Sequence, residues 1–92
     1  MNFKELYREV AKQNGITLSS SKEICQSVFD IITSQLGINE TVRINGFGTF
    51  ELRTREARIG FNPRTQEKLE IPESRYPVFK AAKALKDIAK EA

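Results

Sequence analysis

Apolar residues recur every three to four positions over residues 3–36, which is the spacing of amphipathic helices. Residues 3–14 predict a short first helix, with Asn2 as its N-cap and Gly15 in its C-terminal turn. Thr17 caps a second helix, which Gly37 and Asn39 end. Its apolar stripe is wide, with Ile31 broadening a row formed by Leu18, Ser21, Ile24, Cys25, Val28, Phe29, Ile32 and Leu36. A helical hairpin lying on a sheet or on a partner subunit fits this pattern.

From Thr41 the apolar period changes from helical to two, which predicts β-strands. Val42 and Ile44 share one face, and Phe50 and Leu52 share the corresponding face of the next strand. The intervening Asn45-Gly46-Phe47-Gly48 segment is a strong hairpin signal. We therefore expect two antiparallel strands joined by a tight turn.

Beyond Leu52 the apolar alternation fades while strand-compatible residues continue to Ile59. We expect a ribbon that is polar on both faces and turns at Gly60-Phe61-Asn62-Pro63. The returning strand passes through Leu69, Ile71, Val78 and Phe79. Pro72 and Pro77 lack amide donors, which favours an edge or interrupted strand. Such a ribbon buries almost nothing, so it projects as an arm.

These elements predict an α+β fold in one domain, residues 1–92. Residues 1–40 form a helical dimerisation base, residues 41–81 form a three-stranded antiparallel sheet with its arm, and residues 82–92 form a short C-terminal helix. A chain of 10.5 kDa leaves little interior to fill, yet apolar residues crowd into residues 24–52. Oligomerisation would bury these apolar residues, and we expect a homodimer.

The amino-acid composition limits the kinds of catalytic and metal site that the chain can form. Histidine is absent and Cys25 is the only cysteine, so finger-type zinc sites, Ser-His-Asp triads and Cys-His dyads are excluded. We interpret Cys25 as a small buried hydrophobe. Gly46-x-Gly48 opens a strand rather than a helix, so it is no phosphate-binding loop. We expect no enzyme activity, cofactor, metal or small-molecule substrate. Without a signal peptide or a long apolar run, we expect a cytoplasmic protein with no membrane association.

The net charge of +3 hides an asymmetry along the chain. Residues 41–92 carry eleven basic and seven acidic side chains, against four and five in residues 1–40. The cations lie on an arm that packs against nothing and on the segment after it. Binding to a polyanion explains this excess of positive charge better than simple exposure of a strand face to solvent.

Four separated blocks resemble the HU and integration host factor family of bacterial histone-like proteins. They are GFGTF at 46–50, R-x-G-x-N-P-x-T at 58–65, Ile71-Pro72, and P-x-F-K-A-x-K-A-L-K at 77–86. The resemblance implies an intertwined dimer whose paired arms enter the minor groove and bend double-stranded DNA, with a preference for bent, nicked or bulged duplex. Pro63, rigid and without an amide donor, is the expected wedge, with Phe61 as a second apolar surface. The expected DNA-binding residues are Arg53, Arg55, Arg58, Phe61, Asn62, Pro63, Arg64, Lys68, Arg75, Lys80, Lys83 and Lys86.

Phe61 departs from the basic residue usual in this family, and Gln66 stands where a turn glycine is usual. Ala82 replaces another glycine, which we interpret as a packing change only. Phe61 favours an alternative to sequence-tolerant binding, namely a site-preferring member similar to integration host factor or to a phage transcription factor. A second alternative is a helical protein-interaction module whose basic arm only solubilises it. Failure to bind any duplex at low salt would support that module.

Overall fold

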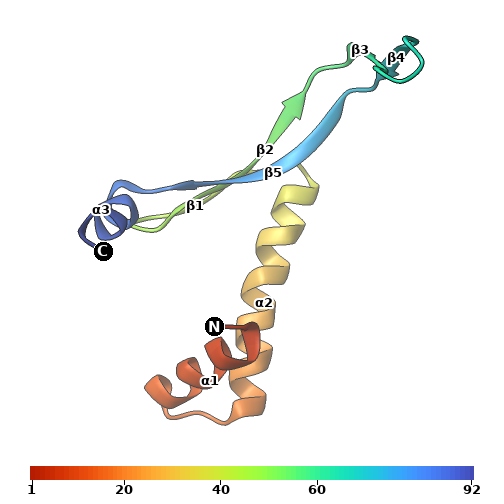
Figure 1. Cartoon of the computed structure of the whole chain (residues 1–92). Coiled ribbons are helices and arrows are strands. Elements are labelled where there is room, and N and C mark those ends of the chain that lie inside the picture. The colour runs from red at the N-terminus through yellow and green to blue at the C-terminus, as the bar shows by residue number, and fades with distance from the viewer. The chain divides into compact units, whose positions relative to one another are not determined.

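The computed structural model describes all 92 residues, which form two compact units, residues 1–35 and 36–92. The elements, shown in Figure 1, are α1 (Phe3–Asn14), α2 (Leu18–Gly37), β1 (Val42–Ile44), β2 (Gly48–Arg55), β3 (Arg58–Phe61), β4 (Lys68–Ile71), β5 (Ser74–Ala81) and α3 (Lys83–Glu91). The expected α+β fold, with a helical hairpin, antiparallel strands and a C-terminal helix, is confirmed. None of the helices combines the length and apolarity needed to cross a membrane.

Both ends of α1 and the start of α2 have the capping residues expected from the sequence. Asn2 Oδ1 accepts a hydrogen bond from the Glu5 amide at 2.9 Å, which satisfies one free donor of the first turn. Gly15 adopts a left-handed conformation at φ 61° and closes α1 with a bond to the Ala11 carbonyl. Thr17 Oγ1 accepts from the Ser20 amide at 3.1 Å and caps α2 in the same way.

The two helices of this unit pack through small residues and aromatic edges. Ser21 is fully buried, and its hydroxyl donates to the Tyr7 carbonyl of α1. The ring of Phe3 meets that of Phe29 edge-on, with centroids 5.8 Å apart. Cys25 is buried, as expected. Only two hydrophobic residues of the whole chain are buried, Ala11 and Cys25.

The second unit contains an antiparallel sheet of three strands in the order β1-β2-β5. Its register sorts the side chains onto two different faces, because directly paired residues point the same way. The apolar face carries Val42, Ile44, Phe50, Leu52, Pro77, Phe79 and Ala81. The polar face carries Arg43, Thr49, Glu51, Arg53, Arg55, Ser74, Tyr76 and Lys80, with Val78 among them.

The β1–β2 turn uses its two glycines differently. Gly46 has φ 77°, and the Phe47 amide donates to the Ile44 carbonyl at 3.0 Å, so a single left-handed residue makes the turn. Gly48 needs no such freedom. A Cβ placed there would lie 2.5 Å from the ring of Phe79, so Gly48 makes room for that ring.

The arm is less regular and less polar than the sequence suggested. The β2–β5 ladder ends at the Arg55–Ser74 pair, and a separate ladder joins β3 to β4. The returning strand is interrupted, as its prolines suggested: it divides into β4 and β5 where Pro72 offers no amide donor. The expected tip also begins too early, because Gly60 and Phe61 belong to β3. Nor are both faces polar, since four apolar side chains occupy the outer ladder, Ile59, Phe61, Leu69 and Ile71.

Candidate nucleic-acid interface

Three of the expected DNA-binding cations share the polar face of the sheet, namely Arg53, Arg55 and Lys80. All three are exposed. Glu51 holds Arg53 in an ion pair of 3.2 Å. The guanidinium of Arg55 stacks on the ring of Tyr76, with its central carbon 4.9 Å from the ring centroid. Stacking on a ring leaves the N–H donors in the guanidinium plane available for phosphate oxygens.

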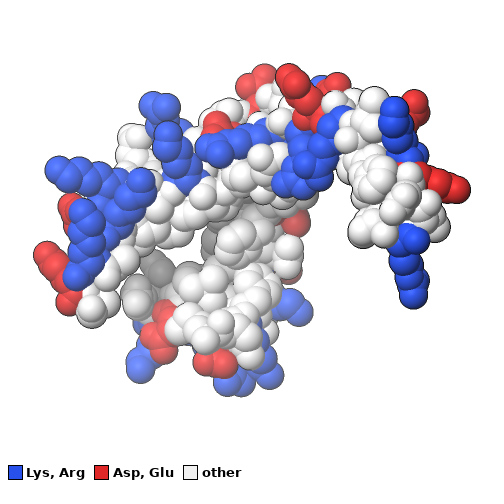
Figure 2. Space-filling view, turned by 45° about the horizontal axis from the view of Figure 1, so that its top comes forward, with Lys and Arg blue, Asp and Glu red and all other residues white.

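Lys83 and Lys86 continue this positive charge on α3, directly after β5. Their spacing of three residues places them on one side of the helix. The start of α3 is tied to the β1–β2 turn, because the Ala82 amide donates to the Phe47 carbonyl at 2.9 Å. Figure 2 shows Lys and Arg side chains gathered over α3 and recurring along the sheet toward the arm. A surface with this density of positive charge attracts anions.

The remaining cations do not lie on one continuous face. Arg75 pairs with Thr54, which places it on the opposite face of the sheet from Arg53 and Arg55. In the outer ladder Arg58 lies opposite Ile71, and Lys68 lies opposite Phe61 on the other face. The arm therefore presents positive charge on both sides. A ribbon with cations on both faces can contact negative charges on both sides of a groove. A ribbon that lies on a flat surface needs cations on one face only.

A hydrogen-bonded loop at residues 62–67 forms the tip of the arm. Asn62 is its anchor, since its side-chain oxygen accepts from the Arg64 amide at 2.9 Å and its carbonyl accepts from the Gln66 amide at 2.8 Å. Gln66 has φ 58°, a left-handed conformation that a glycine would adopt without strain. Pro63 and Arg64 are exposed at the outer end of this loop.

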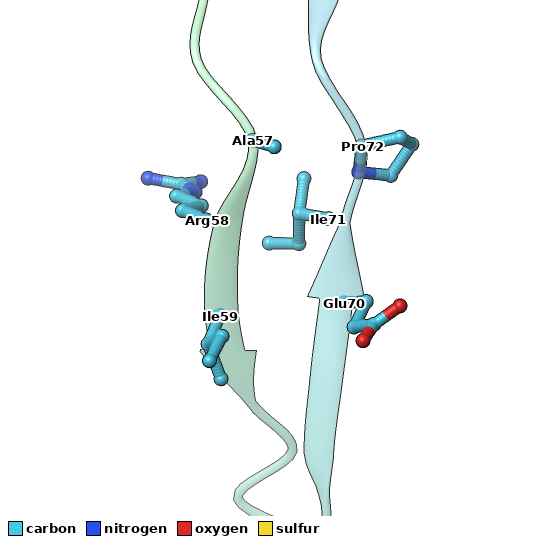
Figure 3. Close-up of a pocket in the computed structure, with 6 residues that line it drawn as sticks. All are labelled: Ala57, Arg58, Ile59, Glu70, Ile71 and Pro72. Carbon is cyan, nitrogen blue, oxygen red and sulfur yellow. The ribbon is translucent and has the colours of Figure 1, made fainter.

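Apolar side chains flank the tip. Ile59 and Phe61 lie on the same face of β3 and are 73% and 61% exposed. Residues 57–59 and 70–72 line an open groove of about 520 Å³. Figure 3 shows Ile71 pointing between the two strands of the arm and Arg58 pointing away from them. The groove offers one cation and one carboxylate, Glu70, so it supplies hydrophobic surface rather than a reactive centre.

Sequence reasoning missed two residues of the polar face, Arg43 and Tyr76. Arg43 lies in the first strand of the hairpin, where one polar residue in an alternating pattern looks like ordinary solvated surface. Only the pairing of β1, β2 and β5 brings it into line with Lys80. No sequence pattern marked Tyr76, because its contact with Arg55 depends on the same strand register.

Comparison with known proteins gives concordant matches over nearly the whole chain. Residues 1–90 match the family model described as "Bacterial DNA-binding protein". The SPbeta prophage-derived DNA-binding protein HU 2 of Bacillus subtilis is 47% identical over 90 residues, 98% of each chain. Among solved structures, the Anabaena HU–DNA cocrystal structure matches with a TM-score of 0.88 and 35% identity, covering 100% of both chains. A mutant of transcription factor 1 matches with a TM-score of 0.68 and 36% identity, covering 100% of this chain and 93% of that one.

Proposed function

Because the chain belongs to the HU family of bacterial DNA-binding proteins, we propose that it is a histone-like architectural protein that binds duplex DNA and bends it. The observation that carries the proposal is the full-length match to the HU chain crystallised with DNA. This chain's own residues supply the chemistry, since the exposed cations of the sheet, the arm and α3 are suited to phosphates. Its site of action is then the nucleoid, and its activity is binding rather than catalysis.

The binding form is a homodimer. Only two hydrophobic residues are buried in the single chain, whereas Phe47 and Phe79 are 44% and 42% exposed beside the half-buried Phe50. The rings of Phe47 and Phe50 lie 5.3 and 4.9 Å from that of Phe79, so they form one apolar cluster. Leaving an apolar cluster of this size in water is unfavourable, so the cluster strongly favours association of two chains.

In the dimer, two arms grip the minor groove while the polar face and α3 neutralise phosphates. The arms contribute Arg58, Arg64, Lys68 and Arg75, and the tip contributes Phe61, Asn62 and Pro63. Pro63 acts as the wedge that opens a base step, because it is exposed, compact and free of an amide donor. Opening a step costs a few kcal/mol, so DNA that is already bent, nicked or bulged binds more tightly.

One gel-shift series tests this function. Linear, nicked and bulged duplexes of the same length are titrated with protein at several salt concentrations. We expect tighter binding to the interrupted duplexes, and a loss of affinity of about 10³ to 10⁵ between 50 and 200 mM salt if roughly 6 to 10 phosphates are contacted. Absence of duplex binding at low salt would refute DNA binding and revive the protein-interaction alternative. Equal affinity for all three duplexes would refute bending.

Phe61 favours a second candidate function, the site-preferring binder. It is 61% exposed beside the tip, where an apolar ring rather than a cation meets the DNA. Stacking or wedging depends on the deformability of a base step, which varies with sequence, whereas phosphate contacts do not. The match to a transcription factor 1 mutant agrees with this reading. Footprinting on a random pool against selected duplexes separates the two functions.

A further inference from the structure

Two residues other than glycine adopt a left-handed backbone conformation, and their residue types suit it unequally. They are Asn39 at φ 60° and Gln66 at φ 58°. Asparagine is one of the few residue types that take this conformation readily, because its short polar side chain bonds to the nearby backbone. Glutamine has a longer side chain and lacks this advantage. The backbone at Gln66 therefore favours a glycine over the residue that is present.

The Gln66 side chain is not needed to close the loop at residues 62–67. The Gln66 amide donates to the Asn62 carbonyl at 2.8 Å, and the Asn62 amide donates to the Glu67 carbonyl at 2.9 Å. The third bond runs from the Arg64 amide to Asn62 Oδ1 at 2.9 Å. These bonds use backbone groups and the Asn62 side chain, while the Gln66 side chain is exposed. A strained residue whose side chain does not hold its own loop points to a contact outside the chain.

The position of Gln66 indicates the chemistry of that contact. Because its amide bonds to the carbonyl of Asn62, Gln66 lies opposite the start of the Asn62–Pro63 segment. An arm tip that enters the minor groove brings this side chain to the edges of the bases. There an A·T pair presents only acceptors, adenine N3 and thymine O2, whereas a G·C pair adds the amino donor of guanine. The side-chain amide of glutamine carries two N–H donors that match the acceptors.

We propose that Gln66 reads the floor of the minor groove beside the base step that Pro63 opens, and that it favours base pairs without an amino group there. The inference rests on the proposed function and deepens it, because it names a side chain that determines which sites are preferred. At an A·T pair the Gln66 amide donates to N3 or O2. At a G·C pair the guanine amino group stands between the acceptors and sets a donor against a donor. This selectivity acts in addition to the deformability of the step.

Nicked duplexes of one length test the proposal, with the base pairs beside the nick made A·T, G·C or inosine·C. Inosine lacks the guanine amino group, so inosine·C keeps the major-groove pattern of G·C but presents only acceptors in the minor groove. We expect the parent to bind the A·T and inosine·C duplexes more tightly than the G·C duplex. Gln66→Gly and Gln66→Met are expected to bind those two about 4- to 100-fold more weakly than the parent, because each of two arms loses a hydrogen bond that contributes about 2- to 10-fold. Their affinity for the G·C duplex stays close to that of the parent.

Two comparisons separate the amide from the backbone that carries it. Gln66→Gly relaxes the left-handed backbone, whereas Gln66→Met keeps the strain and the length of the side chain, so only the loss of the amide is common to both. Asn39→Gly is the matched control, because it replaces another exposed amide residue of left-handed backbone, in the loop between α2 and β1. We expect it to bind all three duplexes as the parent does. Comparing each variant with the parent on the same duplex cancels differences in DNA deformability.

Inosine·C binding by the parent that is no tighter than its G·C binding overturns the proposal, because the amino group would then not decide affinity. Unchanged binding by Gln66→Gly also overturns it, because Gln66 would then be a strained loop residue only. Failure of the proposed function is distinguishable, since the parent then binds none of the three duplexes at low salt. Circular dichroism and sedimentation of both Gln66 variants are expected to match the parent, because the side chain is exposed.

Discussion

Gly46 and Gly48 lie in one hairpin, but substitution is harmful at each for a different reason. Gly46 requires its left-handed backbone, whereas Gly48 leaves room for the Phe79 ring. Gly48→Ala places a methyl group against ring carbons and against the Lys80 carbonyl oxygen, 2.7 Å away. We expect a loss of about 1 to 3 kcal/mol in the free energy of unfolding, measured by chemical denaturation. Gly37→Ala is the control, because nothing lies within 4 Å of its added methyl. Equal stability of the two variants would contradict the role assigned to Gly48.

Pro63 can be separated from the turn that carries it. Asn62 bonds to Arg64 and Gln66, so the loop closes without any hydrogen bond from Pro63. Pro63→Ala is therefore expected to keep the loop, the dimer and most salt-dependent binding, while DNA bending is lost. Energy transfer between dyes at the two ends of a labelled duplex measures the bend. If the variant bends DNA as well as the parent does, Pro63 is a turn residue and not a wedge.

At the scale of elements, the sequence predicted best where local chemistry decides the structure. Both ends of α1 and the start of α2 follow from Asn2, Gly15 and Thr17, whose side-chain or backbone preferences act within a few residues. The β1–β2 hairpin follows from alternation around Gly46. These elements needed no knowledge of distant contacts.

The arm and the faces of the sheet were harder to predict because they depend on pairing between distant residues. Pro72 marks the break in the returning strand, but apolar alternation is too weak in the outgoing strand to show where β2 ends and β3 begins. Placing Arg75 on the apolar side and Arg43 beside Lys80 requires the register of three strands. The sequence therefore showed which segments carry the cations, but not how the cations are arranged on the faces of the sheet.

Lys83 tests the contribution of α3. It occupies the first turn, where the helix dipole disfavours a cation, so Lys83→Ala is expected to leave the helix as stable or more so. Any loss of binding then reports a lost phosphate contact. We expect weaker binding to all sequences alike and a salt slope smaller by about one to two units per dimer. A sequence-selective loss at constant slope would mean that Lys83 reads bases.

At the scale of the whole molecule, the proposed function depends on association of two chains. A chain with two buried hydrophobic residues has no core of its own sufficient for stability. The exposed aliphatic residues of α2 and the cluster around Phe79 supply what a second copy would cover. We therefore propose that folding and dimerisation are one process, and we expect the melting temperature to rise with protein concentration.

Val28→Lys tests this coupling. Val28 is 47% exposed in the single chain and follows Ile24 on α2 by one helical turn, so a lysine fits there if the protein is a monomer. In a dimer that covers this face, the same lysine buries an unpaired charge, and sedimentation and thermal melting are expected to show loss of association and of folded structure together. Gln26→Lys on the polar side of α2 is the control, because its side chain bonds Asp30 at 3.0 Å and a lysine there pairs with the same carboxylate. A folded, monomeric Val28→Lys protein would refute the coupling of folding to dimerisation, and an unaffected dimer would place the interface elsewhere.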